Sequence, residues 1–167
     1  MASVSDIPMQ HSSSPVAVVD ALNSLLEAEL NSIFRFMGEG SPYLSRATAE
    51  VRRPLADMVL AERRRAAEIA NLIDSLGSVP TPAGAIRRDE QYLAFLSLKF
   101  LLPKLVKEKK LHIERYENAL TGLKIAPSVP PEATALLEAH LTELRAELAA
   151  LERAAAIVAE KHDKVTR

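Results

Sequence analysis

Glycine and proline are confined to a few short stretches of this chain, and the segments between them are long. All five glycines fall in three gaps, and most of the ten prolines fall in the same gaps or near the N-terminus. Both residues interrupt helices, so they divide the chain into four predicted helices, over residues 14–37, 45–76, 89–120 and 131–161. We expect residues 1–13 to form a disordered tail and residues 14–162 to form one helical domain.

The composition supports helices and narrows the class of protein. The chain contains 26 Ala, 24 Leu and 16 Glu, all of which favour helix. It has no cysteine, which excludes disulfides, iron–sulfur clusters and a thiol nucleophile. The formal net charge is −1, so nucleic acid would not be attracted in general. No apolar run reaches the length of a membrane span, and residues 1–14 lack the order of a secretory signal. We therefore expect an all-α, cytoplasmic protein that binds no nucleic acid.

Residues 78–88 form a Pro-rich connection between the second and third predicted helices. At about 3.3 Å per residue, this segment could extend over roughly 36 Å, close to the length of a helix. It could carry the chain back along the bundle, so that the two helices run in the same direction. A tight hairpin is the alternative, and we expect the extended crossover.

Ionisable residues interrupt the apolar stripe of each predicted helix near its middle. The stripes have the three- and four-residue spacing of a helix face that packs against a core. The interrupting residues are Glu29 in the first helix, Glu62 and Arg65 in the second, Glu108 and His112 in the third, and His140 and Glu147 in the fourth. An unpaired carboxylate is costly to bury. Four helices that each direct such a group inward therefore predict one shared polar site.

Two kinds of site would satisfy these groups. Carboxylate and imidazole ligands from facing helices suit a metal such as Fe or Mn. Alternatively, Arg65 and the lysines neutralise the acids in a metal-free network, with Arg65 paired to Glu62 or to Glu29. Apolar residues flank Glu29 and Glu62 within their stripes, so both are expected inside. Glu147 and His112 could lie at the stripe edges and reach water.

The first two helices resemble the metal-binding helices of the ferritin-like superfamily, in its bacterioferritin and rubrerythrin branch. Residues 26–34 (LEAELNSIF) resemble the first metal-binding segment, with Glu29 at the ligand position. Residues 62–68 (ERRRAAE) resemble the segment that carries a Glu-x-x-His ligand pair. The resemblance covers about residues 16–160 and implies a ferritin-like four-helix bundle with a di-iron centre. It also implies a carboxylate from the third helix and an imidazole from the fourth, best matched by Glu108 and His140.

Three positions depart from the pattern of that family. Arg65 stands at the first ligand histidine, and Leu137 stands at a bridging glutamate, three residues before His140. A guanidinium stays protonated and does not ligate metal, so two of the six usual ligands are absent. Arg63 stands where the bacterioferritin haem methionine would be, so no haem is expected. A shifted Fe or Mn site is still geometrically possible, formed by Glu29, Glu62, Glu108, His112 and His140.

The third predicted helix also suggests how copies of the chain could associate. Residues 92–102 are apolar nearly all round, more than one face of a bundle can bury. We expect a homodimer interface there, with packing of the 78–88 connection contributing. Lys99 and Lys104 interrupt the run and disfavour a membrane contact.

Two functional hypotheses remain open from the sequence. The first is a ferritin-like protein with an altered carboxylate and histidine metal site, redox-related in iron or peroxide handling. The second is a metal-free structural or interaction module whose core acids are neutralised by Arg65. The chain contains no phosphate loop, dinucleotide motif or serine–histidine–aspartate order, so its motifs assign no enzyme class.

Overall fold

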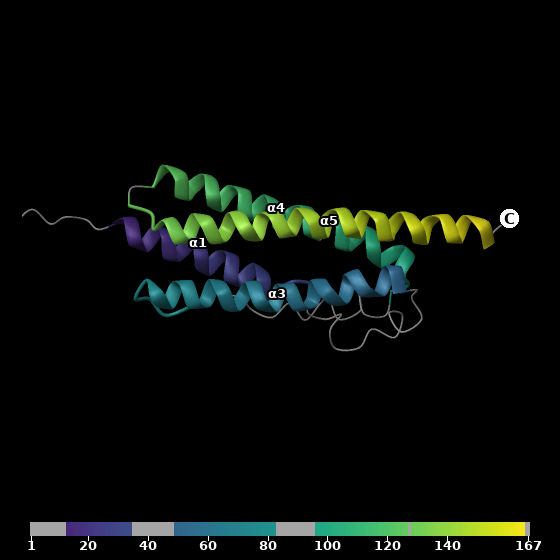
Figure 1. Cartoon of the computed structure of the whole chain (residues 1–167), viewed down its shortest axis with the longest axis horizontal. Coiled ribbons are helices and arrows are strands. Elements are labelled where there is room, and N and C mark those ends of the chain that lie inside the picture. Colours follow the sequence, from purple (N-terminus) through teal and green to yellow (C-terminus); the bar gives the residue numbers. More distant parts are fainter. Residues whose placement is uncertain (1–12, 35–48, 83–95, 127, 166–167) are drawn as a thin grey trace, which may run out of the picture.

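The computed structural model describes residues 13–34, 49–82, 96–126 and 128–165 of the chain. Helices account for most of these residues (Figure 1): α1 (Ser13–Leu30), α3 (Ala49–Ser75), α4 (Leu98–Ile125) and α5 (Pro131–Val165). No strand occurs in the described ranges. The predicted all-α class is confirmed. The predicted tail over residues 1–13 lies outside the described residues, except for Ser13, which begins α1.

α1 is shorter than predicted because the chain leaves the helix at residues 31–33. It ends at Leu30 rather than near residue 37. The Ser32 hydroxyl accepts a hydrogen bond from the backbone N–H of Phe34 and donates one to Glu62. A serine that bonds locally in this way competes with the helical backbone.

α4 also differs from its prediction, because it begins at Leu98 rather than near residue 89. Residues 96 and 97 are not helical, and residues 83–95 lie outside the described part of the chain. Ser97 has an extended backbone, and its carbonyl accepts hydrogen bonds from the amides of Phe100 and Leu101. These contacts mark the start of the helix, as expected of an N-cap residue.

Gly77 directly follows the predicted end of the second helix and terminates α3. Gly77 has a positive φ of 75°, which glycine adopts without a steric penalty. The amide of Ser78 bonds to the carbonyl of Ile73, and the amide of Gly77 bonds to that of Asp74. This pair of bonds is the Schellman motif, which satisfies carbonyls at the end of a helix. α5 begins at Pro131, as predicted, and runs past residue 161 to Val165.

The four helices form an elongated bundle in which α3 and α4 run in the same direction (Figure 1). α1 and α5 run in the opposite direction. The predicted parallel arrangement of the second and third helices is therefore confirmed. The chain returns along the bundle between them, through a connection of which residues 78–82 and 96–97 are described.

The buried core consists of two apolar clusters that occupy successive lengths of the bundle. The first contains Leu22 and Leu26 of α1, Ile69 of α3, Tyr116 of α4 and Leu137 of α5, among others. The second contains Ile33, Leu55, Leu105 and Leu151, among others. In each helix at least one of the predicted polar residues falls between the two clusters, although His140 of α5 falls among residues of the first cluster. The interruptions of the four stripes are therefore brought to one level of the bundle.

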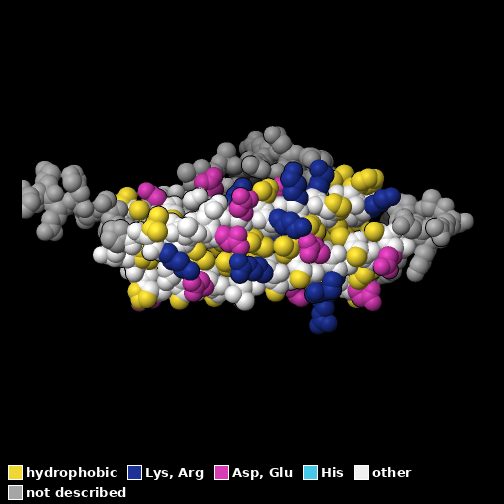
Figure 2. All heavy atoms as spheres, turned by 90° about the horizontal axis from the view of Figure 1, so that it is seen from above, with side chains coloured by type: hydrophobic (Ala, Val, Ile, Leu, Met, Phe, Trp, Pro, Cys, Tyr) yellow, Lys and Arg dark blue, Asp and Glu magenta, His cyan; other side chains and the backbone are white. Residues whose placement is uncertain are grey.

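The surface is mixed in charge. Figure 2 shows one face of the molecule, on which basic, acidic and apolar side chains intermingle. Among the described residues, no helix has the length and apolar character needed to cross a membrane.

Candidate functional site

A layer of buried polar side chains lies between the two apolar clusters. Its members are Glu29 from α1, Glu62 and Arg65 from α3, Lys109 and His112 from α4, and His140 from α5, all at most 6% exposed. Glu147 of α5 adjoins them, with a side chain that is 12% exposed. All four described helices thus contribute to one site.

Arg65 is fully buried and bridges two carboxylates from different helices. Its Nε donates to Glu29 Oε1 at 2.9 Å. Its Nη1 and Nη2 donate to the two oxygens of Glu147 at 2.7 and 3.3 Å. This two-pronged geometry is the strongest form of guanidinium–carboxylate pairing. Burial alone would lower the pKa of Arg65, but Glu29 and Glu147 raise it above its ordinary value. Arg65 is therefore a permanent internal cation.

Lys109 supplies a second cation to the same layer. Its Nζ lies 2.7 Å from Glu147 Oε2 and 3.4 Å from Glu62 Oε1. The ammonium also lies 4.2 Å from the centre of the Phe34 ring, within cation–π range. Glu62 receives a further hydrogen bond from the Ser32 hydroxyl at 2.8 Å. Burial raises the pKa of Glu62 despite the opposing effect of Lys109.

Glu29 concentrates its contacts on one oxygen. Besides Arg65, the hydroxyl of Tyr116 lies 2.7 Å from Oε1 and Nε2 of His112 lies 3.1 Å from it. An ionised carboxylate oxygen only accepts hydrogen bonds, so all three groups donate to it. Burial would raise the pKa of Glu29, but these donors, His112 foremost, lower it to about 2. Its other oxygen, Oε2, is buried and has no partner among the described residues.

A side branch of the layer leads from Tyr116 to the surface. The Tyr116 hydroxyl lies 3.3 Å from Nδ1 of His140, and Nε2 of His140 lies 2.7 Å from the half-exposed Glu68. The rings of His112 and Tyr116 are stacked at 5.5 Å. Burial and the neighbouring Glu29 raise the pKa of Tyr116 well above its ordinary range. Tyr116 therefore acts as a neutral hydrogen-bond donor in the centre of the bundle.

The five residues predicted as metal ligands have different places in this structure. Glu29 and His112 are in direct contact, and His140 is linked to them through Tyr116. Glu62 lies in the layer but contacts Ser32 and Lys109 rather than the other four. Glu108 is only partly buried and lies on the wall of a separate cavity.

Three members of the network were not named individually in the sequence analysis: Lys109, Tyr116 and Glu68. Glu147 was named as an interruption of its stripe, but it was expected at the stripe edge. Lys109 directly follows Glu108, and the spacing of the apolar stripe is compatible with either residue facing the core. The signal that could have found Lys109 is charge, since several inward acids require more than one inward cation.

The arrangement of the helices is similar to that in a solved protein structure. A search of solved structures finds bacterioferritin from Desulfovibrio desulfuricans, with a TM-score of 0.74 and 20% sequence identity, covering 92% of this chain and 86% of that one. The fold is ferritin-like. The structure found is described as showing a diiron site in different catalytic states. No protein-family model and no curated protein matches the sequence. At 20% sequence identity, the similarity to this bacterioferritin concerns the fold alone.

The donor set of the polar layer does not fit the metal centre that a ferritin-like fold implies. Two cations, Arg65 and Lys109, lie between the carboxylates of Glu29, Glu62 and Glu147 and engage oxygens that a metal would need. A divalent ion placed there would meet both fixed positive charges at short range. Within the described ranges, no group of three or more His, Asp or Glu side chains is arranged to hold a metal ion. The unpaired Oε2 of Glu29 is one open acceptor, which falls short of a coordination shell.

Proposed function

We propose that this chain is a ferritin-like module that works without a metal centre, as a structural or interaction protein. The observation that carries the proposal is the buried pair of cations, Arg65 and Lys109, which both bind Glu147. In this proposal the two side chains supply the positive charge that a metal would otherwise supply to a carboxylate-rich core. The bundle would thus be complete as folded, with no need to load a cofactor.

The charges of the layer support this proposal. Three carboxylates, Glu29, Glu62 and Glu147, face Arg65 and Lys109, and His112 donates to Glu29. Breaking a buried pair by removing one partner is costly. Converting this layer to a metal site would therefore require substitutions at several positions together.

A metal site formed by Glu29, Glu62, Glu108, His112 and His140, holding Fe or Mn for redox chemistry, is the competing proposal. It requires Arg65 to release Glu29 and Lys109 to release Glu62, and it requires Glu108 to turn from the cavity wall toward the imidazoles. The two proposals differ in the rate of oxygen consumption expected when Fe(II) is added anaerobically and oxygen is then admitted. We expect the protein with Fe(II) to consume oxygen no faster than Fe(II) in buffer alone. A faster rate that Glu62→Ala abolishes would favour the metal site and overturn our proposal.

A homodimer through α4 would give the module an interaction surface. Part of the predicted apolar run packs inward, because Leu101 and Leu102 are fully buried in the core. Phe100 and Leu111 remain 61% and 38% exposed, and their separation of 11 residues puts them on one helix face, about three turns apart. We expect light scattering to give a dimer mass that Phe100→Lys reduces to a monomer mass. Val16→Lys, at an exposed valine of α1, should leave the mass unchanged. A monomeric wild-type protein would contradict the dimer.

A further inference from the structure

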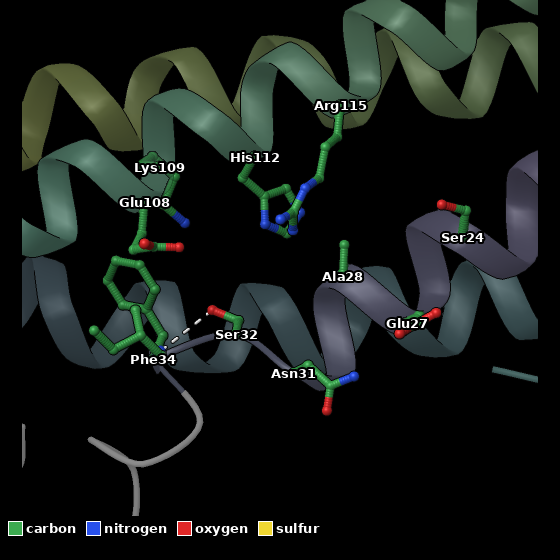
Figure 3. Close-up of a pocket in the computed structure, with 11 residues that line it drawn as sticks. Ser24, Glu27, Ala28, Asn31, Ser32, Phe34, Glu108, Lys109, His112 and Arg115 are labelled. Carbon is green, nitrogen blue, oxygen red and sulfur yellow. Dashed lines mark hydrogen bonds between the residues drawn. The ribbon is translucent and has the colours of Figure 1, made fainter. Parts of the chain in front are cut away.

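A polar cavity of about 240 Å³ lies between α1 and α4, beside the buried layer (Figure 3). Lys109 and His112 form part of its wall, and both are buried. His112 and Arg115 project from α4 toward α1, where Ala28 faces them. The cavity has room for roughly eight water-sized groups at about 30 Å³ each. That volume suits a small metabolite rather than a single ion.

The charged groups at this cavity are available to a ligand. Glu27, Glu108 and Arg115 line it, and none of the three side chains has a hydrogen bond or ion pair with another described residue. In contrast, Lys109 and His112 are committed to Glu62, Glu147 and Glu29. The free groups are two carboxylates and one guanidinium. Neither a simple anion nor a simple cation would satisfy both signs.

The packing of the two helices determines where these charges lie. α1 and α4 run in opposite directions, and the contact of Glu29 with His112 fixes their register. By this register Glu27, two residues before Glu29, lies at the level of Arg115, three residues after His112. In Figure 3 the guanidinium of Arg115 extends toward His112 and lies between Glu27 and Glu108.

Glu108 lies toward one end of the cavity, beside Lys109, whose ammonium is already paired with Glu62 and Glu147. Glu108 and Arg115 are seven residues apart on α4, which is about 10 Å along a helix. Phe34 lies near Glu108 on the wall (Figure 3). A ligand that spans the cavity would therefore meet a carboxylate toward each end and the guanidinium of Arg115 between them.

We propose that this cavity binds an α-amino acid that carries a second, terminal amino group. Its carboxylate pairs with Arg115, its α-ammonium with Glu27 and its terminal ammonium with Glu108. An extended side chain of four or five carbons fits the separation of the two ends. The three charges of the ligand, two positive and one negative, complement those of the three free residues.

The test is calorimetric titration of the full chain with L-lysine and with two analogues that each lack one recognised group. Norleucine lacks the terminal amine, and cadaverine lacks the carboxylate. We expect lysine to bind and both analogues to bind roughly tenfold more weakly or worse, since each loses a charge-assisted hydrogen bond. Arg115→Gln and Glu108→Gln should each weaken lysine binding by about the same factor.

Arg145→Gln is the matched control, because Arg145 is a half-exposed arginine paired with Glu117 away from the cavity. It should leave lysine binding unchanged. Helical content by circular dichroism shows that each variant folds. Absence of lysine binding at millimolar concentration would overturn the proposal. Equal binding of either analogue, or lysine binding that Arg115→Gln or Glu108→Gln leaves unchanged, would also overturn it.

Discussion

Arg65 of α3 and Glu29 of α1 form an ion pair of 2.9 Å in which both side chains are fully buried. The pair joins α1 to α3 inside the bundle. The guanidinium makes its second pairing with Glu147 of α5. One side chain therefore links three helices by charge, and its removal should be felt across the whole bundle.

The first prediction concerns the stability that depends on Arg65. Arg65→Leu leaves Glu29 and Glu147 without their shared cation, and it should lower the free energy of unfolding by roughly 3–5 kcal/mol. Chemical denaturation followed by circular dichroism measures the change. Arg64→Leu is the matched control, because Arg64 is its half-exposed neighbour and pairs with Glu143. Surface pairs contribute about 0–1 kcal/mol, so equal effects of the two substitutions would contradict the buried network.

The second prediction concerns coupling between Lys109 and Glu62. Lys109→Met alone leaves Glu62 without a cation and should be strongly destabilising. Adding Glu62→Gln removes the orphaned charge, so part of the lost stability should return. A double-mutant cycle should give a coupling energy of about 1–3 kcal/mol. If the effects of the two substitutions on the free energy of unfolding were simply additive, the 3.4 Å contact between Lys109 and Glu62 would not contribute to stability.

The third prediction concerns stability in acid. The pKa of Glu29 is lowered from 4.5 to about 2 in the folded protein. A carboxylate with a depressed folded pKa contributes stability above its unfolded pKa and loses it as pH falls toward the folded value. Glu29 should therefore contribute a loss of about 3 kcal/mol between pH 4.5 and pH 2. Glu62 has the opposite sign, because its raised pKa makes the folded state less stable as pH rises through that value.

Urea denaturation at several pH values below 5 measures this loss. Glu29→Gln should flatten the acid decline, although it is less stable than the wild type at neutral pH. Glu117→Gln, which changes a half-exposed carboxylate paired with Arg145, should leave the slope unchanged. If Glu29→Gln lost as much stability in acid as the wild-type protein, another carboxylate would be responsible for the loss.

The fourth prediction is that metal binding can be gained. Arg65→His combined with Lys109→Glu removes both cations and adds an imidazole and a carboxylate beside Glu29, Glu62 and Glu147. Such a donor set suits Fe, Mn or Co. The double variant should retain Co(II) on desalting and show its visible absorption. The control is Arg64→His with Lys110→Glu, at the exposed neighbours of the same two positions, and it should retain none. Equal retention by both variants would show that the inner site had not been formed.

The fold was predictable because its signals are local. Gly77 ends α3 and Pro131 begins α5 where the sequence indicates, and the length of the 78–88 connection favours the parallel pair of helices. Helix ends were less predictable. Ser32 ends α1 through contacts with Phe34 and Glu62, and such a contact is visible only once the helices are packed.

The polar layer was predictable in part. Glu29 and Glu62 lie inside, as their apolar flanks indicate, and Arg65 pairs with Glu29, one of the two partners left open. Lys109 could not be separated from Glu108 by helical spacing alone, because one residue is within the tolerance of a stripe. The inward position of Glu147 depends on the register between α4 and α5, which the 2.7 Å contact with Lys109 reveals.

The most direct test of the account is the metal content of the protein purified without chelator, before and after anaerobic addition of Fe(II). Because Arg65 and Lys109 hold the carboxylates of the core, we predict that no Fe or Mn remains bound after desalting in either sample. Retained Fe or Mn that Glu62→Ala abolishes would contradict the account. It would mean that the internal cations yield their carboxylates to a metal.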